Sequence, residues 1–159
     1  MAIHLRQLGL EDMDDAARVH RRSFDHALPE LAGLHTPEED RAYFRGSVFE
    51  GCEIWGAFDE RLVGFVAFGN GWIEQLYVLP DWHGQGIGRT LLDVAKAKWP
   101  RLTLWTFQQN GPARLFYERN GFVPVEETGG LGNEAKAPDV RYEWHRDGLT
   151  EPSLRSRLL

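Results

Sequence analysis

The spacing of apolar residues changes along the chain, and each change predicts a different kind of element. Residues 3–6 alternate as in a short strand. Between residues 13 and 24 apolar side chains recur every three to four positions behind two acids, which predicts a helix. Residues 25–35 contain a proline and a glycine and are expected to form a loop. A second helix is predicted over residues 36–46, because it opens with the threonine, proline and glutamate of a capping box.

The middle of the chain has the pattern of strands. Short runs of β-branched and aromatic residues occupy positions 54–58, 62–68 and 72–79. Asp-Glu-Arg separates the first two runs and Gly-Asn-Gly separates the next two, and an Asn-Gly pair between such runs is a strong hairpin signal. These residues therefore predict an antiparallel meander.

The remaining residues predict an α/β fold. A helical period runs from Ile87 until Pro100 stops it, and a strand is expected at 101–107, so strand, helix and strand follow one another as in a right-handed crossover. A further helix is expected between Asn110 and Gly121. The last expected segments are a strand near residues 122–126, a glycine-rich loop at 128–133 and a strand near 140–144. The expected fold is thus a mixed central sheet with an antiparallel N-terminal meander, a βαβ crossover and flanking helices.

Size and charge exclude several classes of protein. The chain has 159 residues, which suits one domain, here residues 1–146, followed by a tail at 147–159. We expect the tail to fray, and docking of Leu154, Leu158 and Leu159 on a second copy in a homodimer is the alternative. A single cysteine excludes an internal disulfide, and no residues have zinc-ligand spacing. The absence of a long apolar run or signal peptide predicts a cytoplasmic protein without a membrane span, and the net charge of −6 argues against nucleic-acid binding.

The strongest chemical signal is the segment from His83 to Gly88, between a predicted strand and a predicted helix. Glycines allow a tight turn, and the first N–H groups of a helix attract phosphate. The segment lacks the Gly-Lys-Ser/Thr of a Walker A loop. A dinucleotide fingerprint is disfavoured because Arg89 replaces its third glycine and residues 100–111 contain no acid. A pyrophosphate loop of another kind remains, with a simple chain reversal as the alternative.

A second motif supports the phosphate interpretation. The segment NGPARLFYERNGF places Asn110 at a helix start and Tyr117 two turns along that helix. Together with LYVLPDWHGQGIGRTLL, this segment resembles the GNAT superfamily of acetyl-CoA-dependent N-acetyltransferases over residues 72–123. The resemblance implies a GNAT-like sheet. His83 departs from the Gln or Arg of the family's loop pattern, whereas Gly86 and Gly88 match its glycines.

The resemblance implies acetyl-CoA as the cofactor and suggests which residues bind it. The loop amides are assigned to the pyrophosphate, and the backbones of Leu76 and Val78 to the pantetheine arm. Arginine side chains near the two motifs suit phosphates, although each could equally be an ordinary surface residue. The predicted cofactor-binding residues are Leu76, Val78, His83, Gly84, Gln85, Gly86, Ile87, Gly88, Arg89, Asn110 and Arg114.

Two residues are candidates for proton transfer. Glu74 lies on the strand before the loop, where similar enzymes place a Glu, and simple strand alternation would put Trp72, Glu74, Leu76 and Val78 on one face. Glu74 is the candidate base, and an ordinary surface glutamate is the alternative. Tyr117 is the candidate acid for the leaving thiolate, as the resemblance implies, and a core aromatic residue is the alternative.

The expected activity is therefore transfer of an acetyl group from acetyl-CoA to a primary amine of a small molecule or peptide, by direct attack on the thioester. Phe24 and Trp72 are expected to line the amine site. Net acidity suits a cationic acceptor without identifying it. A non-catalytic acyl-CoA sensor is the alternative function, and a nicotinamide-dependent oxidoreductase is disfavoured by the missing acid.

Overall fold

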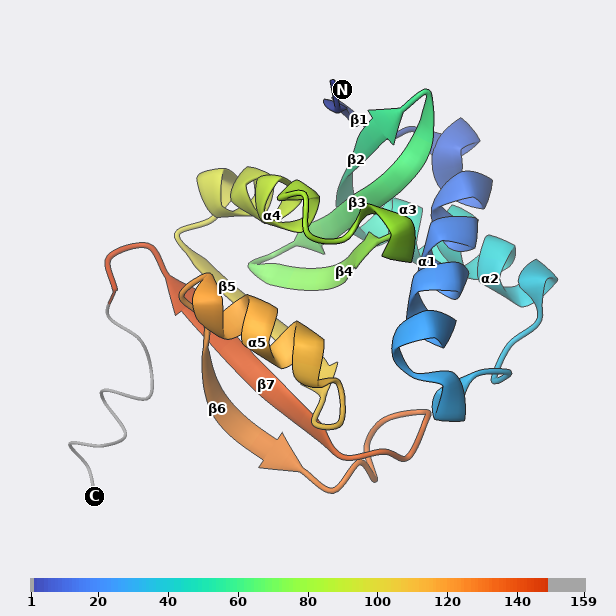
Figure 1. The fold of residues 1–159 in the computed structure, drawn as a ribbon. Coiled ribbons are helices and arrows are strands. Elements are labelled where there is room, and N and C mark those ends of the chain that lie inside the picture. Colours follow the sequence, from blue (N-terminus) through green and yellow to red (C-terminus); the bar gives the residue numbers. More distant parts are fainter. Residues whose placement is uncertain (1, 149–159) are drawn as a thin grey trace, which may run out of the picture. The chain divides into compact units, whose positions relative to one another are not determined.

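The computed structural model describes residues 2–148, which form two compact units, residues 2–95 and residues 96–148 (Figure 1). These are the N-terminal unit and the C-terminal unit. Residues 149–159, with Leu154, Leu158 and Leu159 of the predicted tail, lie outside the described residues.

The N-terminal unit contains four strands and the helices that cover them. Its strands are β1 (His4–Gln7), β2 (Glu53–Asp59), β3 (Arg61–Gly69) and β4 (Trp72–Val78). Its helices are α1 (Met13–Ala27), α2 (Pro37–Tyr43), the π-helical turn η3 (Phe44–Val48), α3 (Phe49–Gly51) and most of α4 (Ile87–Lys98). Short 3₁₀ turns lie at η1 (Leu10–Asp12), η2 (Pro29–Leu31) and η4 (Pro80–Trp82).

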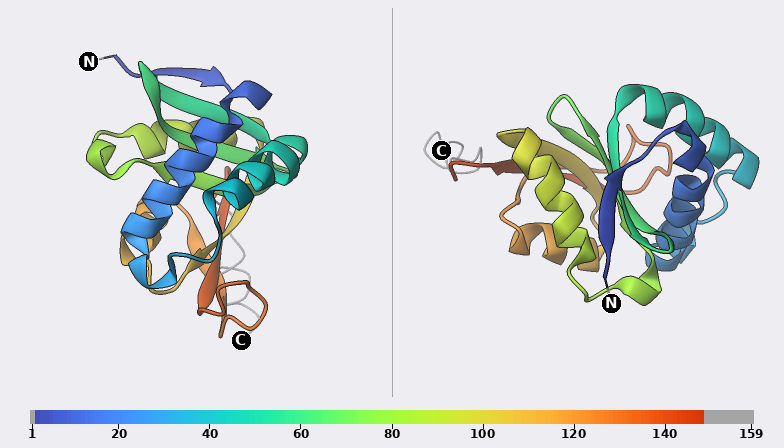
Figure 2. Two further views of the ribbon diagram at one scale, coloured as in Figure 1. Left: turned by 90° about the vertical axis from the view of Figure 1, so that its right-hand side faces the viewer. Right: turned by 90° about the horizontal axis from the view of Figure 1, so that it is seen from above.

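The four strands pair in chain order, each antiparallel to the next. The β3–β4 turn has Asn70 at φ 53° and Gly71 at φ 79°, the left-handed conformations that an Asn-Gly hairpin turn requires. Helices α1 and α2 cover one face of this sheet, and α4 lies on the other side (Figure 2). The predicted antiparallel meander is confirmed.

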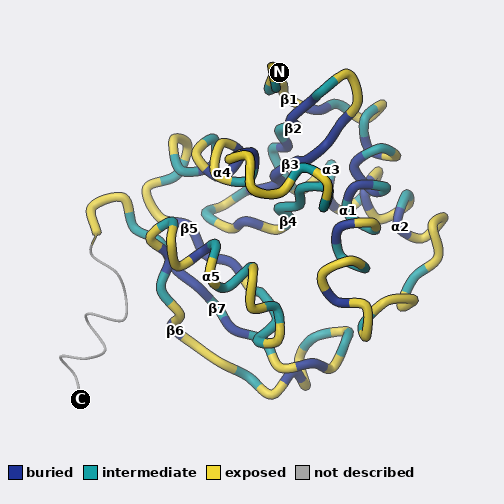
Figure 3. Tube along the Cα trace, in the orientation of Figure 1, coloured by how far each residue is buried: buried dark blue, intermediate teal, exposed yellow. Residues whose placement is uncertain are grey.

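A single apolar layer joins α1 to the sheet. Met13, Phe44 and Phe65 are fully buried in it, and Figure 3 shows β3 as the most continuously buried strand of this unit. β3 is buried because its residues face helices on both sides, which explains why it shows little polar alternation. The packed sheet and helices therefore fix the position of β4, where the next loop begins.

The C-terminal unit is a three-stranded sheet covered by one helix. It contains β5 (Arg101–Phe107), α5 (Gly111–Arg119), β6 (Val123–Thr128) and β7 (Asp139–His145). β7 lies between β5 and β6 and is antiparallel to both. Tyr117 on α5 packs against Phe122 and Tyr142, with ring centroids 5.6 and 6.1 Å apart, so the helix is held to the sheet by aromatic contacts.

Most predicted elements are present at nearly the predicted boundaries. The capping box of α2 is confirmed, because Thr36 Oγ1 accepts from Glu39 N and Glu39 Oε1 accepts from Thr36 N. The helical segment that begins there continues beyond the predicted end at Gly46, through η3 and α3, to Gly51. Among the described residues, no helix is long and apolar enough to cross a membrane.

Candidate functional site

The glycine loop follows η4 and leads into α4. Gly84 and Gly86 both have φ of +79°, a conformation that side chains other than glycine rarely adopt. The carbonyl of Gly86 accepts from both N and Oγ1 of Thr90, at 3.0 and 2.9 Å, which fixes the first turn of the helix. Ile87 is 4% exposed and anchors that turn in the core. The loop is thus shaped by two left-handed glycines and held at its end by a buried side chain.

The amides of this loop suit an anionic group. The backbone N–H groups of Gly84, Gln85 and Gly86 donate no hydrogen bond to any residue that the structure describes. An added Cβ at Gly84 or Gly86 would meet nothing within 4 Å, so the space beside both glycines is open. Gly88 lies in the first turn of α4, whose N–H groups have no partner within the helix. Open amides at the start of a twelve-residue helix are what a pyrophosphate requires. Arg89 is exposed beside them.

His83 holds the loop to the preceding strand. Its Nε2 lies 2.8 Å from the carbonyl oxygen of Val78, and the hydroxyl of Ser23 on α1 donates to the same oxygen at 3.2 Å. Nε2 must carry the proton to donate to a carbonyl. The predicted role of His83 in binding the cofactor is untested, whereas its contact with Val78 gives it a role in positioning the glycines.

The edge of β4 offers backbone groups at the predicted residues. Leu79 N donates to Val63 O on β3, so the peptide groups of Val78 and Leu76, which lie one and three residues earlier, point away from β3. Among the described residues of the N-terminal unit, β4 pairs with β3 on one side only. The carbonyl of Val78 already accepts from His83 and Ser23, so the outward groups that could pair with an extended amide chain are the Val78 N–H and the N–H and C=O of Leu76.

Glu74 lies at a β-bulge that the sequence did not reveal. Ala67 of β3 is opposite Gln75 and its neighbour Phe68 is opposite Ile73, which leaves Glu74 as an extra residue. The prediction that Trp72, Glu74, Leu76 and Val78 share one face is wrong, because the bulge interrupts the alternation. Leu76 and Val78 share a face with Ile73, whereas Trp72 shares one with Gln75. The bulge leaves the Glu74 side chain exposed.

The surroundings of Glu74 include the only cysteine of the chain. Burial and, to a smaller extent, the charge of Glu74 raise the pKa of the Cys52 thiol to about 11. A thiol with this pKa stays protonated at neutral pH and is a poor nucleophile. Cys52 is therefore not expected to carry an acyl group, and direct transfer of the acetyl group to the acceptor amine stays the expectation.

The side of β4 that faces α1 carries an aromatic cluster whose polar members sequence analysis missed. The ring of His20 packs edge-on against Tyr77 at 4.8 Å, and Phe24 lies 5.8 Å away on the same helix. Burial lowers the pKa of His20 to about 4 and raises the pKa of Tyr77 to about 12, so both side chains are neutral at pH 7. Phe24, predicted to line the amine site, is half-buried here, and Trp72 is 36% exposed at the start of β4. The sequence signal was the i, i+4 spacing of His20 and Phe24, which was used only to predict the helix.

In the C-terminal unit, Asn110 precedes α5 as its N-cap and Tyr117 lies on the helix. The side chain of Asn110 accepts from Ala113 N at 3.2 Å, which confirms its predicted helix-capping role. Tyr117 is 8% exposed, and its ring lies 5.3 Å from Phe116. Both the proton-transfer role and the core role considered for Tyr117 are compatible with this burial.

Arg114 has partners within its own unit. Its Nε donates to the hydroxyl of Tyr142 at 3.0 Å, and its Nη2 lies 3.7 Å from Glu127. Tyr142 in turn donates to Glu118 at 2.6 Å. A phosphate would have to compete with these contacts for the guanidinium, so Arg114 is a weaker candidate for phosphate binding than the open loop amides.

Comparisons with known proteins agree with these features. The Acetyltransferase (GNAT) domain family matches residues 50–124, which include the glycine loop and α5. The peptidyl-lysine N-acetyltransferase YjaB of Escherichia coli is 30% identical over 125 residues, which cover 77% of this chain and 83% of YjaB.

Solved structures extend the similarity over most of the chain. The apo form of Escherichia coli YjaB superposes with a TM-score of 0.75 at 25% identity, covering 91% of this chain and 98% of YjaB. The PaiA N-acetyltransferase of Thermoplasma acidophilum, solved in complex with coenzyme A, has a TM-score of 0.69 at 25% identity and covers 91% and 99% of the two chains. These similarities confirm the predicted GNAT-like mixed α/β fold. The chain belongs to the GNAT family and is an acetyltransferase.

Proposed function

We propose that the protein transfers the acetyl group of acetyl-CoA to the side-chain amine of a lysine in a polypeptide. The observation that carries the choice of acceptor is the 30% identity to YjaB of Escherichia coli, a peptidyl-lysine N-acetyltransferase, over 83% of that enzyme. The net charge of −6 supports a cationic acceptor. A small-molecule amine is the competing acceptor.

The cofactor assignment begins at the glycine loop. The amides of residues 84–88 would hold the pyrophosphate, since they are open and precede a helix start. The outward peptide groups of Leu76 and the N–H of Val78 would pair with the pantetheine amides, while the Val78 carbonyl accepts from His83 and Ser23. When bound, acetyl-CoA supplies an activated thioester, and the remaining chemistry belongs to side chains of the protein.

Glu74 is proposed to receive the proton of the acceptor ammonium, directly or through water. A lysine amine has a pKa of about 10.4, so freeing its lone pair at pH 7 costs about 4 to 5 kcal/mol. The bulge supports this role, because it presents the exposed carboxylate at a break in the strand, where no residue of β3 lies opposite it.

Tyr117 is proposed to donate its proton to the leaving thiolate. A phenol with a pKa near 10 keeps its proton at neutral pH and can deliver it to a thiolate as the C–S bond breaks. The aromatic packing around Tyr117 fixes its position on α5, which a proton donor requires.

Release of coenzyme A thiol, followed with acetyl-CoA and a lysine-containing peptide, tests the activity. Arginine replaces lysine in a matched control peptide, and free lysine, polyamines and aminoglycosides represent small acceptors. Thiol release with the lysine peptide alone supports the proposal. Thiol release only with small amines would change the acceptor class, and coenzyme A binding without turnover on any amine would indicate a sensor.

Two conservative variants test the residue roles. Glu74→Gln is expected to lower kcat at least 100-fold and Tyr117→Phe about 10- to 100-fold. Calorimetric binding of coenzyme A should be retained in both variants. A kcat equal to that of the wild type in either variant would exclude the role of that residue.

A further inference from the structure

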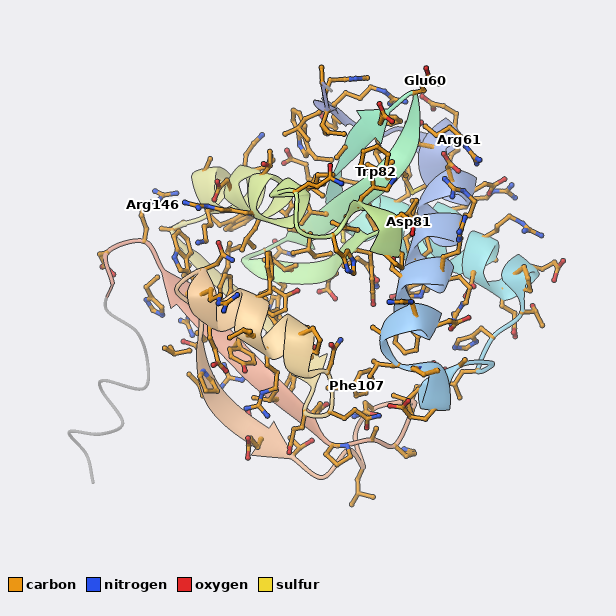
Figure 4. The ribbon with its side chains drawn as sticks, viewed as in Figure 1. Glu60, Arg61, Asp81, Trp82, Phe107 and Arg146 are labelled. Atoms are coloured by element: carbon orange, nitrogen blue, oxygen red, sulfur yellow. The ribbon has the colours of Figure 1, made fainter. Side chains whose placement is uncertain are left out.

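A groove of the N-terminal unit lies beside the glycine loop and contains none of the predicted catalytic residues. Its volume is about 590 Å³, within the range of small-molecule sites. It is formed by one side of α1, the β2–β3 turn and η4, and Figure 4 labels Glu60 and Arg61 on the turn and Asp81 and Trp82 on η4. The ring of His26, which lines the groove, is 6.4 Å from the ring of His83.

The wall formed by α1 is basic. Arg18, Arg22 and His26 follow one another at four-residue intervals and therefore lie on one side of the helix. Arg18 is engaged, since its Nε lies 2.7 Å from Asp15 and its Nη2 donates to Leu62 O. Arg22 is exposed and makes no hydrogen bond or ion pair with any described residue. The guanidinium of Arg22 is thus available to an anionic group in the groove.

The other two walls are acidic. Asp59 and Glu60 lie at the β2–β3 turn and Asp81 lies on η4, and none of these carboxylates pairs with another side chain among the described residues. Arg61, on the same turn, lies 3.4 Å from Asp15 and is partly neutralised by it. The groove therefore separates an available cation on α1 from available anions on the turn and on η4.

The floor and one side of the groove are apolar. Leu62 and Val63 are buried beneath it, while Leu79 and Pro80 are half-buried along its edge. The indole of Trp82 is half-buried in its wall. Trp82 N donates to Leu79 O and Leu79 N donates to Val63 O, so backbone bonds hold η4 against β3. The groove thus has a fixed apolar surface between the basic wall on α1 and the acidic residues of the β2–β3 turn and η4.

We propose that this groove binds a zwitterion of the size of a short peptide with free termini. The carboxylate would meet Arg22, the ammonium would meet Asp81 and the turn carboxylates, and an apolar side chain would lie against Trp82. The three arginines and three acids of the lining balance in formal charge, so a purely anionic ligand would face carboxylates and a purely cationic one would face guanidiniums. This site does not depend on the proposed acetyl transfer.

The test uses the full chain and the tripeptide alanyl-phenylalanyl-alanine, measured by calorimetry at millimolar concentrations without acetyl-CoA. Two ligand controls remove one charge each: the N-acetylated tripeptide lacks the ammonium, and the C-amidated tripeptide lacks the carboxylate. Each capped peptide is expected to bind about tenfold more weakly than the free tripeptide, because one charge-assisted contact is lost.

Protein variants place the ligand. Arg22→Gln and Asp81→Asn should each weaken binding of the free tripeptide about tenfold. Arg119→Gln is the matched control, because Arg119 is also exposed at a helix surface and pairs with no described residue, but it lies on α5. Its Kd should equal that of the wild type. Glu74→Gln should also keep tripeptide binding, which separates the groove from the proposed catalytic chemistry.

Four results would overturn the proposal. The first is the absence of binding heat when the wild type is titrated with the free tripeptide. The second is a capped peptide that binds the wild type with the same Kd as the free tripeptide. The third is a groove variant, Arg22→Gln or Asp81→Asn, whose Kd for the free tripeptide equals that of the wild type. The fourth is an apparent Kd that rises in proportion to acetyl-CoA concentration, which would assign the groove to the cofactor. None of these results bears on whether lysine peptides are acetylated.

Discussion

The ion pair between α1 and α2 is expected to stabilise the helical face of the N-terminal unit. Arg21 Nε and Nη2 donate to the two oxygens of Asp40 at 2.8 and 2.9 Å. Asp40 is 7% exposed. Burial raises the pKa of Asp40, but the hydrogen bonds and charge of Arg21 lower it further, so the net pKa is below its usual value. The carboxylate is therefore bound in its charged form.

We predict that Asp40→Asn lowers the free energy of unfolding by about 2 to 3 kcal/mol at pH 7. Removing one partner of a buried pair typically costs about 3 to 5 kcal/mol. The loss is smaller here because the Arg21 side chain is 21% exposed and keeps Asp25 as a partner at 3.1 Å. For a chain of this length the change corresponds to a fall in Tm of roughly 5 to 10 °C.

Urea unfolding monitored by tryptophan fluorescence measures the change, with an unchanged m value as a check on two-state behaviour. Asp25→Asn is the control, and its cost should stay below about 1 kcal/mol because Asp25 is 38% exposed. Because the pKa of Asp40 is lowered in the folded state, its contribution is present above the unfolded pKa of about 3.9 and is lost as pH falls through the folded pKa. A loss below about 0.5 kcal/mol at pH 7, or one that does not shrink in acid, would refute the argument.

Three further outcomes are expected. Asn110→Ala should destabilise the protein by about 1 kcal/mol in urea unfolding, since Ala113 N loses its acceptor, whereas Asn110→Asp should not. Gly130→Ala should lower the free energy of unfolding by at least about 2 kcal/mol, because the new Cβ would lie 2.3 Å from Ala137 O and the residue has a φ of +93°. A thermal melt measures the change, and Gly129→Ala is the control because a Cβ at Gly129 would meet open space. Glu143→Gln should cost about 3 kcal/mol at neutral pH, because Glu143 is 1% exposed and pairs with Arg141. Burial raises the pKa of Glu143, but hydrogen bonds from Arg141 and His145 and the nearby arginine charges lower it further, so the net pKa is below its usual value. The difference in unfolding free energy between the wild type and Glu143→Gln should therefore shrink as pH falls.

Local signals explain why so much of the fold could be predicted. The capping box at Thr36, the Asn-Gly turn at Asn70 and the cap at Asn110 each act within a few residues of the chain. The glycine loop was recognisable for the same reason, since left-handed backbone at Gly84 and Gly86 is a property of the residues themselves.

Features that depend on contacts distant in the sequence were not predicted. The bulge at Glu74 exists because of how β4 pairs with β3, and it overturned the simple alternation assumed for the strand. The bond from His83 to Val78 depends on how the loop folds back, and the neutral state of His20 depends on its burial against Tyr77 and Phe44.

The amino-acid sequence by itself determined the order of the elements, the glycine-rich turn before α4 and the family resemblance, because these rest on backbone preferences and short motifs. Only the tertiary structure decided where Glu74 lies relative to its strand, which charges find partners and which remain available around the groove beside η4. Pairing and burial depend on residues brought together from distant parts of the chain, and no local pattern specifies them.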